Sequence, residues 1–244
     1  MCLPVNAIGF MALPINPGNR KVISNLKTNV ATHSAVLLKR QWLSDKSFEI
    51  MISSPPDFQF KPGQRISLSL GGHVRDYSIV SAPQESELIF CIRSVAGGKL
   101  STLLSISDID TPLSFYGPHG YFTFRPSPRP AVFVATGTGI APFCSMARAG
   151  ISGFTLLHGV RLLEDLYYAN QFQQCAHKFV PCLTEAKKLP ANAFKGKVTD
   201  YLERYLPSGA YDFYLCGRRE MIRDATLLID ERFPDSLVYT EMFY

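Results

Sequence analysis

Short runs of alternating apolar and polar residues characterise the chain between residues 30 and 124. Turn residues such as Gly71-Gly72 and Gly97-Gly98 separate the runs. Successive side chains on a strand point to opposite faces, so this alternation predicts half-buried strands. About six short strands with regular turns predict a small antiparallel β-barrel. The clearest runs are residues 48–52, 66–70, 88–92 and 121–124, and residues 100–106 predict a helix among them.

The pattern changes after residue 130. Residues 131–135, Ala-Val-Phe-Val-Ala, are continuously apolar, which is typical of a strand buried on both faces. Between further apolar runs of this kind, apolar residues recur every three or four positions, as in a helix, most clearly at residues 220–233. Strand–helix alternation predicts a parallel sheet covered by helices on both faces. The further apolar runs are residues 154–157, 179–183, 213–216 and 237–239.

The two patterns predict a two-domain chain. Residues 125–130, Arg-Pro-Ser-Pro-Arg-Pro, form a stiff and exposed connector between them. We predict an N-terminal extension at residues 1–29, a β-barrel domain at 30–124, this linker, and an α/β nucleotide-binding domain at 131–244. Ligands of parallel sheets bind at the carboxyl ends of the strands, so those ends are the first places to look for a site.

Charge and cysteine usage narrow the functional classes. The net charge is +5, which favours nucleotides or an acidic protein partner, although a solvated basic surface gives the same number. No basic run resembles a nucleic-acid-binding arm. The six cysteines lack the close spacing of a zinc or iron–sulfur site, so no metal is expected. Free thiols within apolar runs indicate a reducing compartment, and we expect a cytoplasmic protein.

The first residues do not predict membrane insertion. Residues 2–19 are uncharged, but Pro4, Pro14 and Pro17 interrupt them and no basic segment precedes them. A signal peptide or a membrane span would need an unbroken apolar stretch. We therefore expect a loosely held extension and no stable membrane insertion.

One polar stretch within the barrel half has the composition of a ligand site. Arg75-Asp76-Tyr77-Ser78 follows an alternating run and a glycine turn, which predicts a strand with Arg75 and Tyr77 on one face and Asp76 and Ser78 on the other. A guanidinium and a phenol ring on one face suit a planar, phosphorylated ligand. An edge strand with exposed polar residues is the alternative.

A glycine-rich loop follows the first apolar strand of the α/β half. Residues 136–142 read Thr-Gly-Thr-Gly-Ile-Ala-Pro. Gly137 and Gly139 permit a tight turn and close backbone approach, and Pro142 suits the first turn of a helix. The free N–H groups of that helix would face an anion such as a pyrophosphate. This is not the G-x-G-x-x-G fingerprint, because a proline replaces its last glycine.

Three further stretches are candidates. Cys216-Gly217 begins the loop after the fourth apolar strand, where a thiol could touch a flat ring or could be a core side chain. Residues 97–101, Gly-Gly-Lys-Leu-Ser, open the predicted barrel helix, where Ser101 could help to hold a phosphate or could cap the helix. The chain ends in two aromatic residues, which need a core edge or a flat cofactor to cover.

In order and spacing these stretches resemble the ferredoxin–NADP⁺ reductase family of flavoproteins, from about residue 30 to the end. The matching motifs are Pro62-Gly63-Gln64, Arg75-x-Tyr77-Ser78, Gly98-x-x-Ser101, Gly117-Pro118-x-Gly120, Gly137-Thr138-Gly139-Ile140-Ala141-Pro142, Cys216-Gly217 and Glu241-x-Phe243. The resemblance implies an FAD-binding barrel followed by a pyridine-nucleotide domain.

The resemblance also implies a role for each motif. Arg75 would pair with the FAD pyrophosphate, Tyr77 would stack on the isoalloxazine, and Ser78 would bond near its N5 atom. Cys216 would place the nicotinamide against the flavin, with Glu241 nearby, so Ser78, Cys216 and Glu241 are the expected catalytic residues. FAD would also contact Gly98, Lys99, Leu100, Ser101, Phe243 and Tyr244. The NAD(P) diphosphate would lie against Gly137, Thr138, Gly139 and Pro142, beside Gly217.

The choice between NADH and NADPH depends on charges near the second and third parallel strands. Arg161, Lys187, Lys188 and Lys197 are candidate partners for a 2′-phosphate, and each could equally be a solvated surface charge. Glu185 would repel a phosphate and could accept from a ribose hydroxyl. The sequence therefore slightly favours NADH.

Three functions are consistent with this reading. The leading one is an FAD enzyme that passes electrons from NAD(P)H to an acidic ferredoxin- or flavodoxin-like protein. The second is the reductase component of an oxygenase, or a reductase of free flavin. The third is a non-catalytic flavin-binding subunit or sensor.

Overall fold

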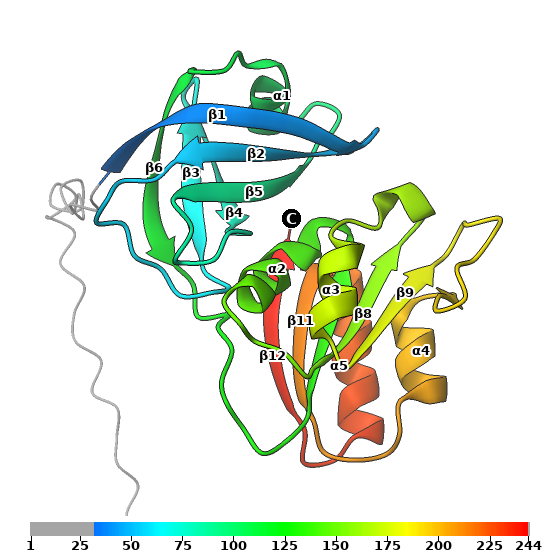
Figure 1. The fold of residues 1–244 in the computed structure, drawn as a ribbon. Helices are drawn as coiled ribbons and strands as arrows, with labels where there is room; N and C mark the ends of the chain where they lie inside the picture. Colours follow the sequence, from blue (N-terminus) through cyan, green and yellow to red (C-terminus); the bar gives the residue numbers. More distant parts are fainter. Residues whose placement is uncertain (1–31, 244) are drawn as a thin grey trace, which may run out of the picture. The chain divides into compact units, whose positions relative to one another are not determined.

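The computed structural model describes residues 32–243. The predicted extension at residues 1–29 and the terminal Tyr244 lie outside the described residues. Two six-stranded sheets organise the described part of the chain, one antiparallel and one parallel (Figure 1). The predicted fold class, an antiparallel barrel followed by an α/β parallel sheet, is confirmed.

The antiparallel sheet has the strand order β4-β3-β6-β1-β2-β5. Alternate residues face opposite sides because the strands have a period of two, and in β5 both sides are buried: Phe90 lies in the barrel core, whereas Ile89 and Cys91 pack into the core that contains Phe133. After β4 the chain reaches the opposite edge of the sheet, where the Val80 N–H donates to the Ile89 carbonyl at 2.8 Å. Helix α1 (Lys99–Ile106) buries Leu100 and Leu104 in the same core. The strands are β1 (Thr32–Ser44), β2 (Ser47–Ser53), β3 (Arg65–Leu70), β4 (His73–Ser78), β5 (Glu87–Arg93) and β6 (Pro112–His119).

The turn between β3 and β4 fixes the register of the edge hairpin. Gly71 and Gly72 have φ of 57° and 77°, which glycine adopts without the strain that a Cβ would bring. A two-residue loop pairs Leu70 with His73, and counting back along both strands pairs Arg65 with Ser78. The hairpin therefore brings the Arg75–Ser78 stretch alongside β3.

The parallel sheet has the order β10-β9-β8-β7-β11-β12. Phe133 of β7 packs with Phe143 of helix α2 and Phe172 of helix α3, whereas Val132 and Val134 pack with α4 and α5. Helices therefore cover both faces, as predicted. The strands are β7 (Ala131–Thr136), β8 (Thr155–Val160), β9 (Lys178–Leu183), β10 (Phe194–Lys195), β11 (Asp212–Arg218) and β12 (Leu237–Phe243). The helices are α2 (Ala141–Arg148), α3 (Ala169–Cys175), α4 (Val198–Tyr205) and α5 (Arg219–Arg232), with 3₁₀ turns η1 (Gly137–Ile140) and η2 (Leu163–Asp165).

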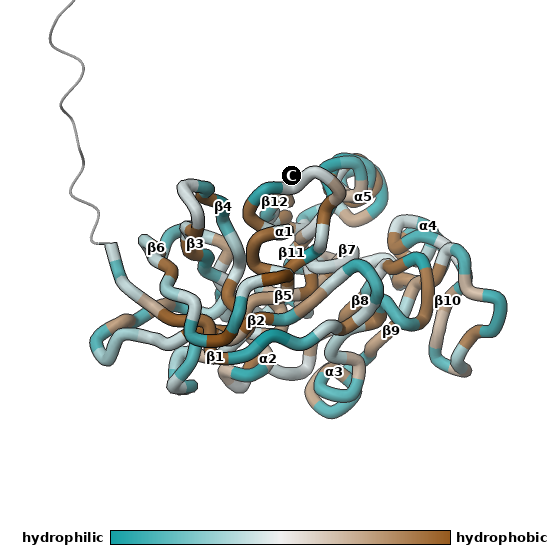
Figure 2. Tube along the Cα trace, turned by 90° about the horizontal axis from the view of Figure 1, so that it is seen from above, coloured by the Kyte–Doolittle hydropathy of each residue, from teal (hydrophilic) through white to brown (hydrophobic). Residues whose placement is uncertain are grey.

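Helix α5 shows the amphipathic pattern that the sequence predicts. Met221, Ile222, Ala225 and Ile229 are buried against the sheet, while charged residues between them, such as Arg223 and Asp224, face solvent. Figure 2 shows hydrophobic and hydrophilic residues alternating around this helix. Among the described residues, no helix has both the length and the apolar composition needed to cross a membrane.

The order of the parallel strands changes direction at β7. The chain proceeds from β7 to β8 and β9 on one side, and then returns to place β11 and β12 on the other side. Ligands of such sheets bind where the order reverses, in the space between the loops that leave in opposite directions. The carboxyl ends of β7 and β11 therefore define the expected ligand position.

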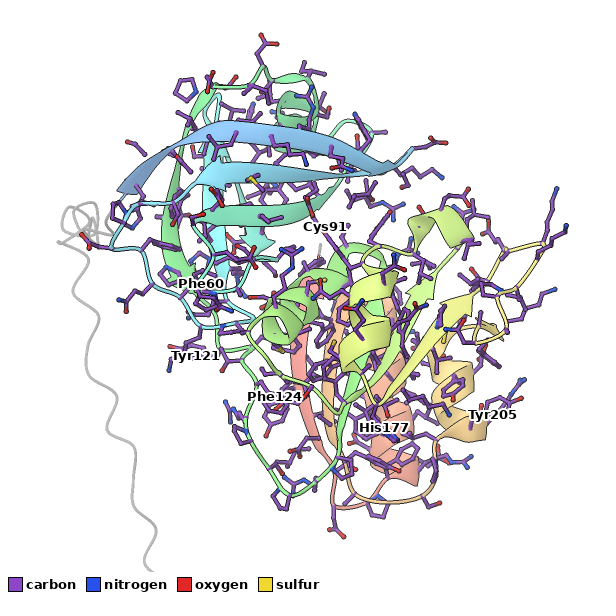
Figure 3. All side chains as sticks on the ribbon, viewed as in Figure 1. Phe60, Cys91, Tyr121, Phe124, His177 and Tyr205 are labelled. Carbon is purple, nitrogen blue, oxygen red and sulfur yellow. The ribbon has the colours of Figure 1, made fainter. Side chains whose placement is uncertain are left out.

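Two local predictions were wrong. Residues 121–124 belong to no strand of the structure, because Phe122 packs against Phe143 and Tyr214 of the other sheet's core, while Tyr121 is 92% exposed and points outward (Figure 3). The apolar and polar residues of this segment alternate because it is an irregular connector with one buried side chain, Phe122. Cys216-Gly217 lies within β11 and not in a loop, because pairing with β12 continues to Arg218.

Candidate active site

Strand β4 places the polar stretch at an edge of the barrel sheet. Arg75 is exposed and its Nη1 donates to the Val74 carbonyl at 2.7 Å. Tyr77 is half-buried against the barrel core, and burial raises the pKa of its phenol to about 12. Asp76 pairs with Arg65 of β3, and Ser78 bonds Glu241, which itself pairs with Arg65. Asp76 and Ser78 therefore share one face of the strand, as predicted.

Ser78, Cys216 and Glu241 come together from three strands. The Ser78 hydroxyl donates to the Glu241 carboxylate, and both side chains are buried. Cys216 lies directly opposite Glu241 in the pairing of β11 with β12. Burial and the nearby Glu241 charge raise the pKa of the Cys216 thiol well above its usual value, so it remains a neutral thiol. The three predicted catalytic residues thus occupy one site.

The charge of Glu241 is balanced by its neighbours. Burial raises the pKa of this carboxyl above its usual value, and the Ser78 hydrogen bond and the nearby Arg65 guanidinium offset part of that rise. Arg65 Nη1 lies 3.2 Å from Glu241 Oε2. Both carboxylate oxygens therefore have a partner, as a buried carboxylate requires.

The glycine loop after β7 approaches β11 closely. Gly139 lies in η1, and a Cβ built on it would be 2.4 Å from the Cys216 carbonyl oxygen. Only glycine permits this contact. Pro142 occupies the first turn of α2, as predicted. The loop and Cys216 are therefore held together at the switch point of the sheet.

Thr136 ties the same two strands on the other side of the loop. Its hydroxyl accepts from the Arg218 N–H at 3.0 Å. Gly217 has φ of 133°, and a Cβ there would be 2.2 Å from the Thr136 Oγ1. This explains the glycine in the Cys216-Gly217 pair.

No side chain caps the N-termini of α1, α2, α3 and α5, and two of these helices, α1 and α2, begin at the stretches predicted to bind phosphate. Gly98 is the N-cap of α1, and neither it nor Ile140, the N-cap of α2, makes a side-chain cap bond. Ser101 lies in the first turn of α1 and is not its cap, so the capping alternative is wrong. Because Leu100 is buried in the barrel core, only its backbone is available to a ligand. Lys99 is exposed beside it.

Arg161 and Glu185 are paired with each other. The guanidinium donates to both carboxylate oxygens, at 2.6 and 2.8 Å, across the carboxyl ends of β8 and β9. Both side chains are exposed, and the pair lowers the pKa of Glu185 and raises that of Arg161. Lys187, Lys188 and Lys197 are exposed nearby in the sequence. The cation proposed for a 2′-phosphate and the carboxylate proposed to repel it thus form one ion pair.

The C-terminal strand ends beside the site. Phe243 is the last residue of β12, pairs in register with Arg218, and packs half-buried against the core of the parallel sheet. Its partner in the prediction, Tyr244, lies outside the described residues.

A single cleft of about 2420 Å³ connects these groups. Ligand pockets are commonly about 300–1,000 Å³, so this cleft is large enough for two nucleotide ligands. Two uncapped helix N-termini suit two diphosphate groups, and the half-buried Tyr77 offers a flat apolar face. The residues present therefore fit an FAD and a nicotinamide nucleotide. Its walls include Arg75, Tyr77, Ser78, Gly98, Lys99, Leu100, Ser101, Gly137, Thr138, Arg161, Glu185, Gly217, Glu241 and Phe243.

Sequence reasoning missed Arg65 and His158. Arg65 follows the Pro62-Gly63-Gln64 motif, and counting back from the Gly71-Gly72 turn would have placed it opposite Ser78. His158 is fully buried on β8, where its Nε2 lies 3.0 Å from the Gly137 carbonyl. A histidine within an apolar run, one strand away from the glycine loop, was the available signal.

Comparison with known proteins agrees with this geometry. Residues 36–124 match the family described as oxidoreductase FAD-binding domain, and residues 133–226 match the oxidoreductase NAD-binding domain. FAD and a nicotinamide nucleotide are therefore the cofactors of the two domains.

Curated relatives include two components of dioxygenase systems of Pseudomonas putida, one named for electron transfer and one as a reductase. One is a toluate 1,2-dioxygenase electron transfer component, 31% identical over 80% of this chain and 62% of its own length. Another is the ferredoxin–NAD(P)⁺ reductase component of a naphthalene 1,2-dioxygenase system, 30% identical over 88% of this chain and 71% of its own. The chain spans about three fifths of the length of the toluate relative.

A solved structure has the same fold. The ferredoxin NADP⁺ reductase from Neisseria gonorrhoeae, with bound FAD and NADP, aligns with a TM-score of 0.76 and 21% identity, over 87% of this chain and 99% of that one. The two domain matches in this order, the relative aligned over most of both chains and the shared fold lead to one assignment. The chain belongs to the ferredoxin–NADP⁺ reductase-like family of flavoprotein oxidoreductases.

Proposed function

We propose that this protein takes hydride from a reduced nicotinamide nucleotide and passes the electrons to a separate protein acceptor. The observation that supports this most directly is the Ser78–Glu241 hydrogen bond beside Cys216, because it joins the barrel to the carboxyl ends of the parallel strands at a cleft large enough for both cofactors. Bound FAD would supply the hydride acceptor and the ability to release electrons one at a time.

The protein's part is to bind, orient and exclude water. Arg75 and the first turn of α1, with Gly98 to Ser101, hold the FAD pyrophosphate, and Tyr77 supports the ring system. Gly137 to Pro142 hold the diphosphate of the nicotinamide nucleotide. Gly217 lines the cleft where the nicotinamide would rest, with Cys216 buried directly behind it, and Ser78 and Glu241 would supply hydrogen bonds at the reacting edge. Phe243, which lines the cleft at the end of β12, would cover a cofactor.

We propose the domain division at residues 125–130 and a cytoplasmic location. Five cysteines of the described chain are free, and Cys91, Cys144, Cys182 and Cys216 are buried. This is typical of proteins in a reducing compartment. The basic net charge suits an acidic electron carrier as partner.

A second acceptor is an oxygenase component. The names of the toluate and naphthalene dioxygenase relatives support it. Titration of the reduced protein with a ferredoxin, a flavodoxin, an oxygenase component and a free flavin would separate the possibilities, because a dedicated reductase transfers rapidly to one of them.

The test is anaerobic stopped-flow of the FAD-loaded protein with NADH and with NADPH, following loss of flavin absorbance. We expect NADH to be faster, because the Glu185 carboxylate repels a 2′-phosphate. If neither nucleotide bleaches the flavin, the protein is a flavin-binding subunit without this activity.

Glu185→Gln tests the origin of the preference. The substitution frees Arg161 from its bidentate partner and removes the repelling charge, so we expect the NADPH rate to rise several-fold at subsaturating nucleotide while the NADH rate changes little. Glu203→Gln, an exposed change on α4 outside the cleft, is the control. An unchanged ratio of rates would remove Glu185 from the specificity argument.

A further inference from the structure

Arg65 joins two carboxylates that differ in exposure. Its Nη1 lies 3.2 Å from Glu241 Oε2, and its Nε lies 3.1 Å from Asp76 Oδ2. Glu241 is buried, whereas the Asp76 side chain is 48% exposed. The planar guanidinium presents several N–H donors at fixed angles, so one side chain can hold both partners at once.

The outer carboxylate is itself held in place. Asp76 accepts from the Ser67 hydroxyl and lies 3.4 Å from the His119 Nε2. Ser67 lies on β3 and His119 on β6, and these two strands pair with each other. Asp76 therefore orients Arg65 toward the buried site.

The space around Arg65 is limited by the backbone. A Cβ at Gly120 would lie 3.3 Å from Arg65 Nη1 and 3.8 Å from Glu241 Oε2. The Gly120 carbonyl also accepts from Gln64 Nε2 at 3.2 Å, which fixes this segment beside the ion pair. The guanidinium thus occupies a defined position between β3 and β12.

The ionic state of Glu241 decides how Ser78 can bond. An ionised carboxylate only accepts, so Ser78 must donate its single hydrogen to Glu241 and present oxygen lone pairs to the cleft. A protonated Glu241 could donate to Ser78 instead, which would free the Ser78 hydrogen for a group in the cleft. The charged groups that face Glu241 are Arg65 from β3 and Asp76 from β4, and the neutral thiol of Cys216 faces it from β11.

We propose that Arg65 is a positioning residue that keeps Glu241 ionised and so fixes Ser78 as a hydrogen-bond acceptor toward the cleft. An acceptor there favours a ligand edge that bears an N–H, as reduced flavin does at N5, over an edge that only accepts. This consequence for flavin rests on the proposed function, whereas the effect on Glu241 does not.

The first experiment measures the protonation of Glu241 itself. Infrared titration of the FAD-loaded protein follows the carboxylic acid C=O band, which Glu241→Gln identifies by its loss. We expect Arg65→Gln to shift the midpoint of this band upward by about one pH unit or more. Burial then raises the pKa of Glu241 without the opposing effect of the Arg65 guanidinium. Arg65→Lys retains a charge and should shift it less. An unshifted midpoint in Arg65→Gln would overturn the proposal.

Arg129→Gln is the matched control. Arg129 has nearly the same exposure as Arg65, 33% against 34%, and its Nε also pairs with a buried carboxylate, Asp212, at 2.6 Å, but it does not line the cleft. It should leave the Glu241 midpoint unchanged. A shift of equal size in both variants would assign the effect to general loosening of the fold.

The second experiment measures the midpoint potential of the bound flavin. If Ser78 becomes a donor in Arg65→Gln, oxidised flavin is favoured and the potential should fall relative to the wild-type protein and to Arg129→Gln. A potential that does not fall, together with a shifted Glu241 midpoint, would overturn the Ser78 part of the proposal. If neither nucleotide bleaches the flavin of the wild-type protein, the proposed function is refuted. The infrared titration would then still decide whether Arg65 controls the protonation of Glu241.

Discussion

His158 is a buried titratable residue that supports the glycine loop. A carbonyl only accepts, so Nε2 must bear the proton that bonds Gly137, and Nδ1 is left without a partner in the described chain. Burial lowers the pKa of this imidazole from 6.5 to about 4, so it is neutral in the folded protein. The residue thus links an interior strand to the backbone of a ligand loop.

The stability of the protein should fall in acid because of His158. Its folded pKa lies below its unfolded one, so the unfolded state binds a proton first, and the contribution is complete above pH 6.5 and lost as the pH falls toward 4. A shift of this size corresponds to about 3 kcal/mol. Denaturant titrations of the wild-type protein and of His158→Gln between pH 7 and pH 4 measure this directly. If the free energy of unfolding falls equally with pH in the two proteins, His158 does not cause the loss of stability in acid.

At the residue scale, the sequence was informative where a short motif indicates a specific chemical role. Ser78, Cys216 and Glu241 were predicted as a group, and the structure brings them together. Arg65 and His158 were missed because their partners are distant in the chain, and only strand register or sheet order places them beside the site.

At the scale of elements, the turn η1 is fitted against strand β11. We expect Gly139→Ala to push η1 away from Cys216, because the new Cβ would have to share space with a backbone carbonyl. Overpacking of this kind costs about 1–3 kcal/mol. Thermal melts should show the loss, and the dissociation constant for nicotinamide nucleotide should rise.

Gly137→Asn is the control for backbone strain in the same turn. Gly137 has φ of 53°, which asparagine tolerates, and a Cβ there would meet nothing within 4 Å. Its melting temperature should stay close to that of the wild-type protein. A fall as large as that of Gly139→Ala would show that the turn is sensitive to any side chain and not to the contact with β11.

Strands and helices with one apolar face were predictable, whereas connectors were not. Residues 220–233 closely match α5, and residues 100–106 lie within α1. The sequence of residues 121–124 has the pattern of a strand because an irregular segment that crosses between two cores can also expose one side chain and bury the next. Hydrophobic periodicity reports burial, and only hydrogen bonding distinguishes a strand from such a connector.

At the scale of the whole molecule, the described residues fall within one compact unit. Several polar contacts join the barrel to the parallel sheet, among them the Ser78–Glu241 and Arg148–Glu85 pairs and the bond from the Tyr168 hydroxyl to Glu49 Oε2 at 2.7 Å. Tyr168 precedes α3 in a left-handed backbone conformation, with φ of 58°, and Arg148 lies 5.9 Å from its ring. Its geometry therefore depends on both domains being in place.

Tyr168→Phe should loosen the attachment of the two domains without disturbing either core. The substitution keeps the ring and removes the donor, leaving the half-buried Glu49 carboxylate without this partner at a cost of about 1–3 kcal/mol. Calorimetry should then show a broader transition, and hydrogen exchange should rise in β2 and at the start of α3. Tyr205→Phe, on the exposed end of α4, is the matched control and should change neither. A single sharp transition at the wild-type temperature would mean that the Tyr168–Glu49 bond does not contribute to holding the two domains together.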